Sequence, residues 1–541
     1  MTEVDGVVAV FSIRHPKLVA QDLDRLVAGV PETALVRMGL ASLAPYGYPE
    51  FTEIEPGSNV GIAVLRGPPA GPATFVGFAK LKEGGKLWNL LGRRFPARRR
   101  HGDWVLFART PADLAKLKAP DSAIAFLEKP QTADICVWAR AYPEYLARIE
   151  AGCRNKLNSL LAKAPPDRRQ AGSRAIDILI RGMSEIRSGE VSLSFADSGI
   201  KIEYAVQFRP DSPAGTFLRY PLGPDPEIAS HISGNALVSF VFRQNPVAAA
   251  DLANTFLNAL ARVGYPPLTA WLKTARPGLA AAMAESNGGA AAVFDFAYGT
   301  KNAGRAATPA LFYAASGHFT PEVVRMYMKS VRSLSPDIFA AVQASMPSRL
   351  RALSWSKPVY TENAVTVDGV AFDLDAMPGL GAPGGAVSPP REYIGVAGGN
   401  LVIADSESIL RRNLPNLTAR APLADGLRLV GPPDTLGDVE LHGANLVGDI
   451  EAALGSRSED EDAKARFADL RSAYAAAGPV SVIVTASQAR VTETVFIPYK
   501  FIETSIRLGQ YMSARRIDFR KLFGLPGPSA RHPWPRRTGR S

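Results

Sequence analysis

The chain has 541 residues, 46% of them hydrophobic and 21% charged, a globular composition with enough apolar side chains for two or more cores. The net charge of +11 favours an anionic partner (nucleic acid, anionic lipid or an acidic polymer) without choosing among them. Two cysteines, Cys136 and Cys153, do not define a secreted disulfide framework or a zinc site. We expect two separate thiols, although a helix folding back on its strand would let them approach.

Membrane and export signals are missing from the sequence as it stands. No segment reaches the roughly 18 consecutive apolar residues of a transmembrane helix. The first predicted strand begins at Val7, directly after Met1-Thr-Glu-Val-Asp-Gly6, so no signal peptide is visible. We hypothesise that a leader is lost through the choice of start codon. An upstream in-frame leader in the gene would then indicate an extracytoplasmic location; until that is tested, the compartment stays open.

Residues 1–220 alternate between short strands and helices. The strands predicted from period-two alternation and β-branched residues are Val7–Ile13, Val60–Leu65, Thr74–Ala79, Gly102–Phe107, Ala133–Ala139, Glu190–Phe195 and Ile200–Phe208. Helical spacing is predicted around Leu18–Val27, Leu87–Leu91, Leu114–Leu117, Pro143–Leu161 and Asp167–Ile186. In the last two strands apolar and polar residues alternate regularly, so we expect one face to be wet.

The same order of elements begins again after a Pro/Gly-rich joint at residues 221–233. The predicted strands of this second series are Asn235–Phe242, Ala290–Ala297, Ala310–Ala315, one containing Ile403, Gly437–Ala444, Pro479–Thr485 and Val491–Ile497. The predicted helices of this series cover Leu252–Leu257, Pro321–Val331 and Lys500–Met512. Two more are predicted, one containing Leu410 and one beginning at Leu446. A shared order over about eight elements predicts an internal duplication.

We therefore predict an α+β fold of two tandem pseudo-repeats, with mainly antiparallel curved sheets and helices packed on one face. The first repeat covers residues 1–220 and the second residues 234–514, with an insert near residues 350–390. The remaining residues, 515–541, form a basic tail that we expect to be disordered.

Two segments carry a resemblance to known proteins: Gly102-Asp-Trp-Val-Leu-Phe107, and the pair Val191-Ser-Leu-Ser-Phe195 with Ile200-Lys-Ile-Glu-Tyr204. With the repeated strand and helix order, they make the chain similar to a loosely defined group of uncharacterised bacterial proteins of unknown function. Many of these are predicted to be exported or envelope-associated. The resemblance implies a duplicated strand and helix module and an envelope association. It implies no activity and no catalytic residue.

Motifs for catalysis and cofactors are not convincing in this chain. Gly379-Leu-Gly-Ala-Pro-Gly384 matches a dinucleotide-binding pattern by letter, but Pro383 and the prolines after it favour a loop. Ser354-Trp-Ser-Lys357 lies in a predicted strand, where residues three apart point to opposite faces, so it is a chance match. The histidines lack metal-ligand spacing, and we predict no metal, no cofactor and no catalytic residue; they are His15, His101, His231, His318, His442 and His532.

Three surface features remain as candidate sites. Asp373 and Asp375 are two residues apart on one predicted strand, so their side chains share a face. A solvated face of a hairpin is favoured over a role in acid/base catalysis or cation binding. Arginines in a predicted loop between a helix and a strand could bind anions: Arg93, Arg94, Arg98, Arg99 and Arg100. Apolar and basic residues near the end of the chain could bind an anionic membrane surface: Phe501, Ile502, Ile506, Arg515 and Arg516. The plainer alternative for the arginines is a solvated loop, and for the residues near the end of the chain it is a packed final helix.

The sequence thus favours a non-enzymatic binding or scaffold component associated with the cell envelope. Its partner would be an anionic surface or polymer, or an apolar ligand in a groove between the repeats. One alternative is an enzyme with a dispersed site near Asp373 and Asp375. Another is a nucleic-acid-binding protein that uses the arginine clusters and whose affinity falls steeply with salt.

Overall fold

We analysed a computed structural model of the chain. It describes residues 7–14, 53–55, 58–66, 73–128, 133–160, 162, 165–196, 198–297, 308–332, 360–376, 391–419, 421–454 and 461–517.

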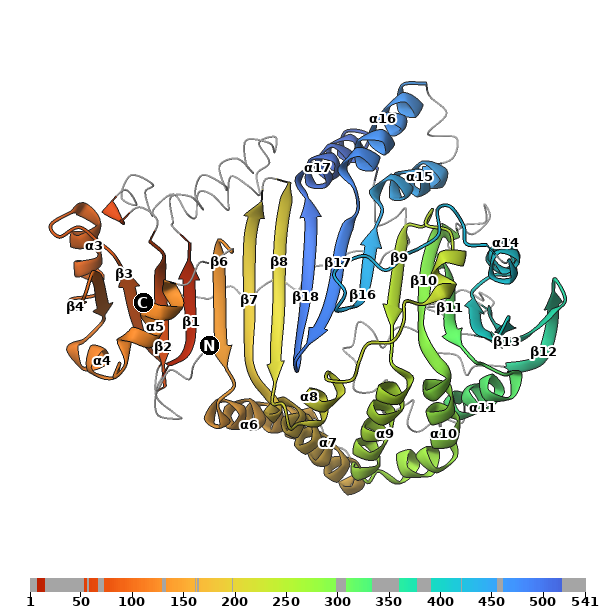
Figure 1. Cartoon of the computed structure of the whole chain (residues 1–541), viewed down its shortest axis with the longest axis horizontal. Helices are drawn as coiled ribbons and strands as arrows, with labels where there is room; N and C mark the ends of the chain where they lie inside the picture. The colour runs from red at the N-terminus through yellow and green to blue at the C-terminus, as the bar shows by residue number, and fades with distance from the viewer. Residues whose placement is uncertain are drawn as a thin grey trace, which may run out of the picture.

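The strands of the described part form one large sheet in which every pairing is antiparallel (Figure 1). In chain order they are β1 Val7–Ile13, β2 Val60–Leu65, β3 Thr74–Ala79, β4 Ala97–His101, β5 Trp104–Ala108, β6 Ile135–Arg140, β7 Ile186–Ala196, β8 Gly199–Phe208, β9 Val238–Arg243, β10 Ser286–Ala297, β11 Thr308–Gly317, β12 Tyr360–Val367, β13 Val370–Ala376, β14 Arg391–Ala397, β15 Asn400–Ala404, β16 Thr435–Leu441, β17 Val480–Ser487 and β18 Arg490–Pro498. Mixed helices and a large antiparallel sheet confirm the predicted α+β class.

The hydrogen-bonded neighbours give the spatial order β4-β5-β3-β2-β1-β6-β7-β8-β18-β17-β16-β9-β10-β11-β15-β14-β13-β12. The β8–β18 pair joins the two halves of the chain in the middle of the sheet, in register from Gln207–Arg490 to Gly199–Pro498. Outward from this pair the order is β8, β7, β6, β1, β2, β3, β5, β4 on one side. On the other side it is β18, β17, β16, β9, β10, β11, β15, β14, with β13 and β12 beyond.

Eight of the described helices begin with proline, whose fixed φ suits the first helical turn. They are α3 Lys86–Arg94, α4 Pro111–Ala115, α5 Pro120–Leu127, α6 Pro143–Leu160, α7 Pro166–Ser184, α8 Pro213–Phe217, η3 Glu227–His231, α9 Pro246–Arg262, α10 Pro266–Glu285, α11 Pro321–Arg332, α14 Glu407–Thr418, α15 Gly443–Leu454, α16 Glu461–Ala477 and α17 Tyr499–Ala514. In Figure 1, α6, α7, α9 and α10 lie at one end of the strands and α15, α16 and α17 at the other. No described helix is drawn across β7, β8, β18 or β17.

The segment that begins at Gly102 has the predicted form. Gly102 has φ +59°, which suits a glycine in the tight turn between β4 and β5. After β5, the Thr110 hydroxyl accepts the backbone N–H of Asp113 and caps α4. Leu114 and Leu117 are buried in the core. In the second half Gly399 (φ +80°) precedes β15 and the hydroxyl of Ser406 caps α14, so the same local rules operate twice.

Residues 221–233, expected as a joint between domains, are packed into the second half. They include η3, and Ile228, Ala229 and Ile232 are all buried in the core under β10 and β11. Together with the β8–β18 pairing, this packing joins the two halves through a continuous hydrogen-bonded sheet.

Candidate functional site

The central strands place two rows of side chains on one face of the sheet, because directly paired residues share a face. The first row is Phe11, Val137, Val191, Tyr204, Glu493, Val484, Gly437 and Phe242. The second row is Ile13, Ile135, Leu193, Ile202, Val495, Val482, Val439 and Phe240. We call these two rows the apolar face. The second row is apolar throughout, and the first row carries one charge, on Glu493.

Several residues of the apolar face are exposed to solvent, on β7, β8 and β9. Tyr204 is 44% exposed, Val191 41% and Phe240 37%. Most of the other residues are half-buried, and Glu493 is exposed. Phe240 and Phe242 stack with their ring centroids 5.2 Å apart. A continuous apolar patch of this extent is unusual on a soluble surface and is typical of a site that binds something.

Among the helices of the described part, those that pack on this side of the sheet do so toward its two ends. At the β5 end, Leu87 of α3 packs with Val105 and Phe107. At the β15 end, Val324 and Met328 of α11 pack with Leu401. The eight strands from β1 to β9 lie between these two covered regions. At about 4.8 Å per strand they span roughly 34 Å, which is long enough for an extended alkyl chain.

The opposite face of the same strands is polar, and several of its residues are buried. We call it the polar face; Ser192 is 7% exposed and Ala205 5%. Glu190 accepts a hydrogen bond from the Cys136 thiol at 3.5 Å and pairs with Arg490 at 3.2 Å, which links the two halves of the chain. Burial raises the pKa of the Cys136 thiol to about 12, and the Glu190 carboxylate adds to the rise. The arrangement therefore suppresses thiolate chemistry.

Asp438 on β16 is the most perturbed carboxyl group of the polar face. It is 2% exposed, and one oxygen accepts the backbone N–H of Val430 at 3.2 Å. Burial raises its pKa to about 7; the hydrogen bond opposes this rise and the nearby Glu440 carboxylate adds to it. In the described residues no group of three or more His, Cys, Asp or Glu side chains is arranged to hold a metal.

The arginine cluster does not form a loop, contrary to the prediction. Arg93 and Arg94 end α3, whereas Arg98, Arg99 and Arg100 lie in β4, which pairs with β5. Because successive residues of a strand point to opposite faces, Arg98 and Arg100 lie on one face of the sheet and Arg99 lies on the other. Arg98 stacks over the Trp88 ring at 4.6 Å, and Arg100 pairs with Glu83 at 3.0 Å. Arg99 is exposed on the other side, so the arginines of β4 do not share one face.

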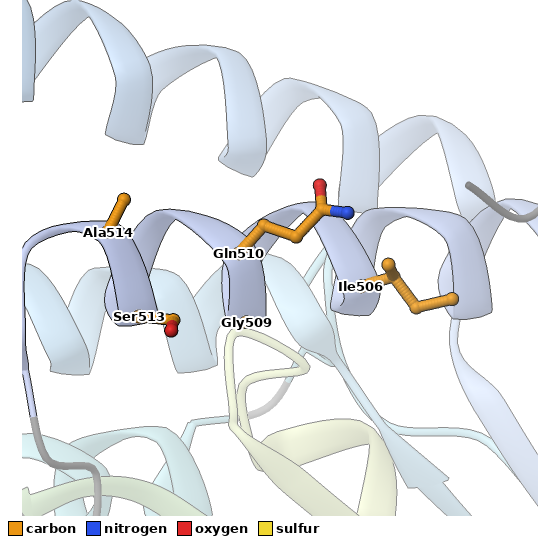
Figure 2. A pocket seen from close by; sticks show the side chains of 5 residues that line it. All are labelled: Ile506, Gly509, Gln510, Ser513 and Ala514. Carbon is orange, nitrogen blue, oxygen red and sulfur yellow. The ribbon is translucent and has the colours of Figure 1, made fainter. Parts of the chain in front are cut away.

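The predicted membrane-surface residues of α17 are also divided. Phe501 is buried and meets Tyr474 edge to face at 4.9 Å, so it belongs to the core and not to a membrane anchor. Ile502 is half-buried, while Arg515 and Arg516 are exposed just after the helix. Ile506 lines an open hollow of about 550 Å³ on α17, shown in Figure 2, where Gln510 and Ala514 project to one side of the helix and Ser513 to the other. Of the helices in the described ranges, none is long and apolar enough to cross a bilayer.

The remaining candidates take plain structural positions. Asp373 lies in β13 and is 6% exposed, so it is buried and does not lie on the solvated hairpin face that we expected. Asp375 follows in the same strand. Cys136 is buried, Cys153 is half-buried, and both thiols are free. The Ser354 and Gly379 motifs, His15, His532 and the tail beyond residue 517 lie outside the described residues.

The described histidines are dispersed and serve local contacts. His101 is hydrogen-bonded to Asp121 at 2.5 Å, and Nδ1 of His231 lies 2.9 Å from the Asn416 carbonyl oxygen. His442 lies 3.6 Å from Glu440, and His318 is exposed.

Glu493 is the residue that the sequence reading missed. Its signal is visible in the sequence, since it interrupts the apolar alternation Val491, Val495, Ile497 of one strand face. In the comparable strand β8, the face reads Ile200, Ile202, Tyr204, Val206 without a charge.

Comparison with known proteins adds no relative, since no family model, curated protein or solved structure matches the chain.

Proposed function

We propose that the protein is a non-enzymatic binding component of the cell envelope, and that the apolar face holds an apolar ligand with a long alkyl chain. The observation that carries this is the exposure of Val191, Tyr204 and Phe240 in two nearly uninterrupted apolar rows. Covering them with an alkyl chain would remove apolar area from water at about 25 cal/mol per Å². The envelope association rests on the resemblance of the Gly102 and Val191 segments, and fractionation with N-terminal sequencing tests it.

We also propose that the chain is a tandem duplication. The support is the matching strand order outward from β8–β18, together with the repeated hairpin, cap and helix at β4–α4 and β14–α14. On this proposal β13 and β12 form the insert, at the far end of the sheet. The ligand would then lie over the junction of the two repeats, the region where the sequence led us to expect an apolar ligand.

The test is titration with a neutral fluorescent apolar probe, N-phenyl-1-naphthylamine. We expect saturable binding to the wild type and about tenfold weaker binding to Phe240→Lys, because a charge in the second row opposes an apolar ligand. Phe256→Lys is the matched control: Phe256 is 60% exposed on α9, away from the apolar face, and should leave the affinity unchanged. Equal affinity of Phe240→Lys and wild type would contradict the assignment of the site. Mass spectrometry of a solvent extract then identifies any co-purified ligand.

A further inference from the structure

We propose that the ligand of the apolar face is a cationic amphiphile, a single molecule whose ammonium group pairs with Glu493 while its alkyl chain lies along the rows. This inference rests on the proposed function and adds the chemical class of the ligand. The occupant is a monomeric long-chain ammonium compound and not a membrane surface.

The first step of the argument is the position of Glu493. It pairs directly with Tyr204 on one side and with Val484 on the other, and Val491 and Val495 flank it along β18. Its carboxylate is exposed, and no ion pair to it is present in the described ranges. The charge thus stands near the centre of an otherwise apolar surface.

The second step is that the fold does not require a carboxylate at this position. Glu493 is the fourth residue of β18, counted from its hairpin turn, and the fourth residue of β8 is Ile202 on the same face. An apolar residue therefore fits the equivalent position of a paired strand. Among the positions of the two rows in the described structure, Glu493 alone carries a charge.

The third step concerns the cost of covering this carboxylate. A neutral alkyl chain lying along the first row would strip water from Glu493 without replacing the lost hydrogen bonds, which is unfavourable. A ligand with an anionic head group would in addition be repelled by the Glu493 carboxylate. An ammonium group would compensate the charge, and the exposed ring of Tyr204 beside it offers a cation–π contact. The apolar rows continue on both sides of Glu493, so the chain of such a ligand has room in either direction.

The experiment compares three ligands of equal chain length: dodecyltrimethylammonium and dodecanoate below their micellar concentrations, and dodecanol below its solubility limit. Displacement of N-phenyl-1-naphthylamine gives the affinities. For the wild type we expect the ammonium compound to bind about tenfold more tightly than the alcohol, and dodecanoate to bind most weakly. Glu493→Gln should remove the preference while retaining dodecanol binding, and Glu503→Gln on α17, where Glu503 is exposed, should preserve it.

The outcomes separate the two proposals. If neither the probe nor any of the three ligands binds, the proposed function is wrong. If the probe and dodecanol bind but the ammonium compound shows no advantage, or if the advantage survives in Glu493→Gln, then the apolar site stands and the cationic ligand is refuted.

Discussion

The two faces of the central strands differ in burial, and on β7 and β8 the more exposed residues are on the apolar face. On the polar face of β7 and β8, Ser192 and Ala205 are less than a tenth exposed, whereas Val191 and Tyr204 on the apolar face are each more than two fifths exposed. Toward the ends of the sheet the relation is conventional, because α3 and α11 cover the apolar side chains there. The comparison teaches that alternation fixes which residues share a face, while the packing around the strands sets how far each face meets water.

The largest expected effect separates a buried phenylalanine from an exposed one within a single strand. Phe78 of β3 is fully buried, and Phe75, on the other face of the same strand, is 54% exposed. We expect Phe78→Ala to lower the free energy of unfolding by about 3–5 kcal/mol and Phe75→Ala to change it by less than about 1 kcal/mol. Urea denaturation of both variants measures the contrast, and equal losses would show that the two faces of β3 are packed alike.

A second prediction concerns the pH dependence that Asp438 gives to the polar face. Its pKa rises from 3.8 in the unfolded chain to about 7 in the folded protein, so the folded state holds the proton more tightly. This contribution to stability is complete below pH 3.8 and is lost as the pH rises through 7. The loss is at most about 4 kcal/mol, from 1.36 kcal/mol per pKa unit.

Asp438→Asn keeps an oxygen acceptor for the Val430 N–H and removes the titration. The variant should therefore exceed the wild type in stability at pH 8, by about 1–4 kcal/mol, and lose its advantage toward pH 4. Thermal unfolding across this pH range measures it, with Asp211→Asn, a change at an exposed position, as the control. A constant difference between variant and wild type at all pH values would rule out Asp438 as the source.

The smallest effect concerns the arginines of β4, which the two faces separate. Arg98 lies over the Trp88 ring, whereas Arg99 is exposed on the other face. We expect Arg98→Ala to cost about 0.5–1 kcal/mol of stability and Arg99→Ala to cost almost nothing. Chemical denaturation distinguishes them. A larger loss for Arg99→Ala would mean that Arg99 has a structural partner beyond the contacts described.

Periodicity and turn chemistry predicted much of the fold, because strands with one apolar and one polar face leave a period of two in the sequence. Much of the order of elements and the strand after Gly102 were predictable for this reason, and helical spacing placed Leu114 on the face that is buried. The strand formed by Arg98 to Arg100 was not predictable from the sequence. Three consecutive charged residues hide any alternation of apolar and polar side chains, and the segment becomes a strand by pairing with β5.

The candidate site was harder to predict, because the pattern identifies two faces without saying which of them meets water. One face of β7 was expected to be wet; Ser192 on the polar face is buried, while Val191 on the apolar face is exposed. Phe501 shows the same limit in a helix: its tertiary contact with Tyr474, invisible in the sequence, turns a supposed membrane anchor into a core residue.

The pairing of β8 with β18 has a consequence for synthesis on the ribosome. Gln207 donates a hydrogen bond to the carbonyl of Ala489, 282 residues further along the chain. At about 5–20 residues per second, the outer edge of β8 waits roughly 15–60 s for its partner strand to emerge. During this interval an unpaired strand edge and its adjoining apolar surface are both accessible to other nascent chains. We therefore expect the newly made first half to depend on a chaperone, and truncation before β18 to yield aggregated protein.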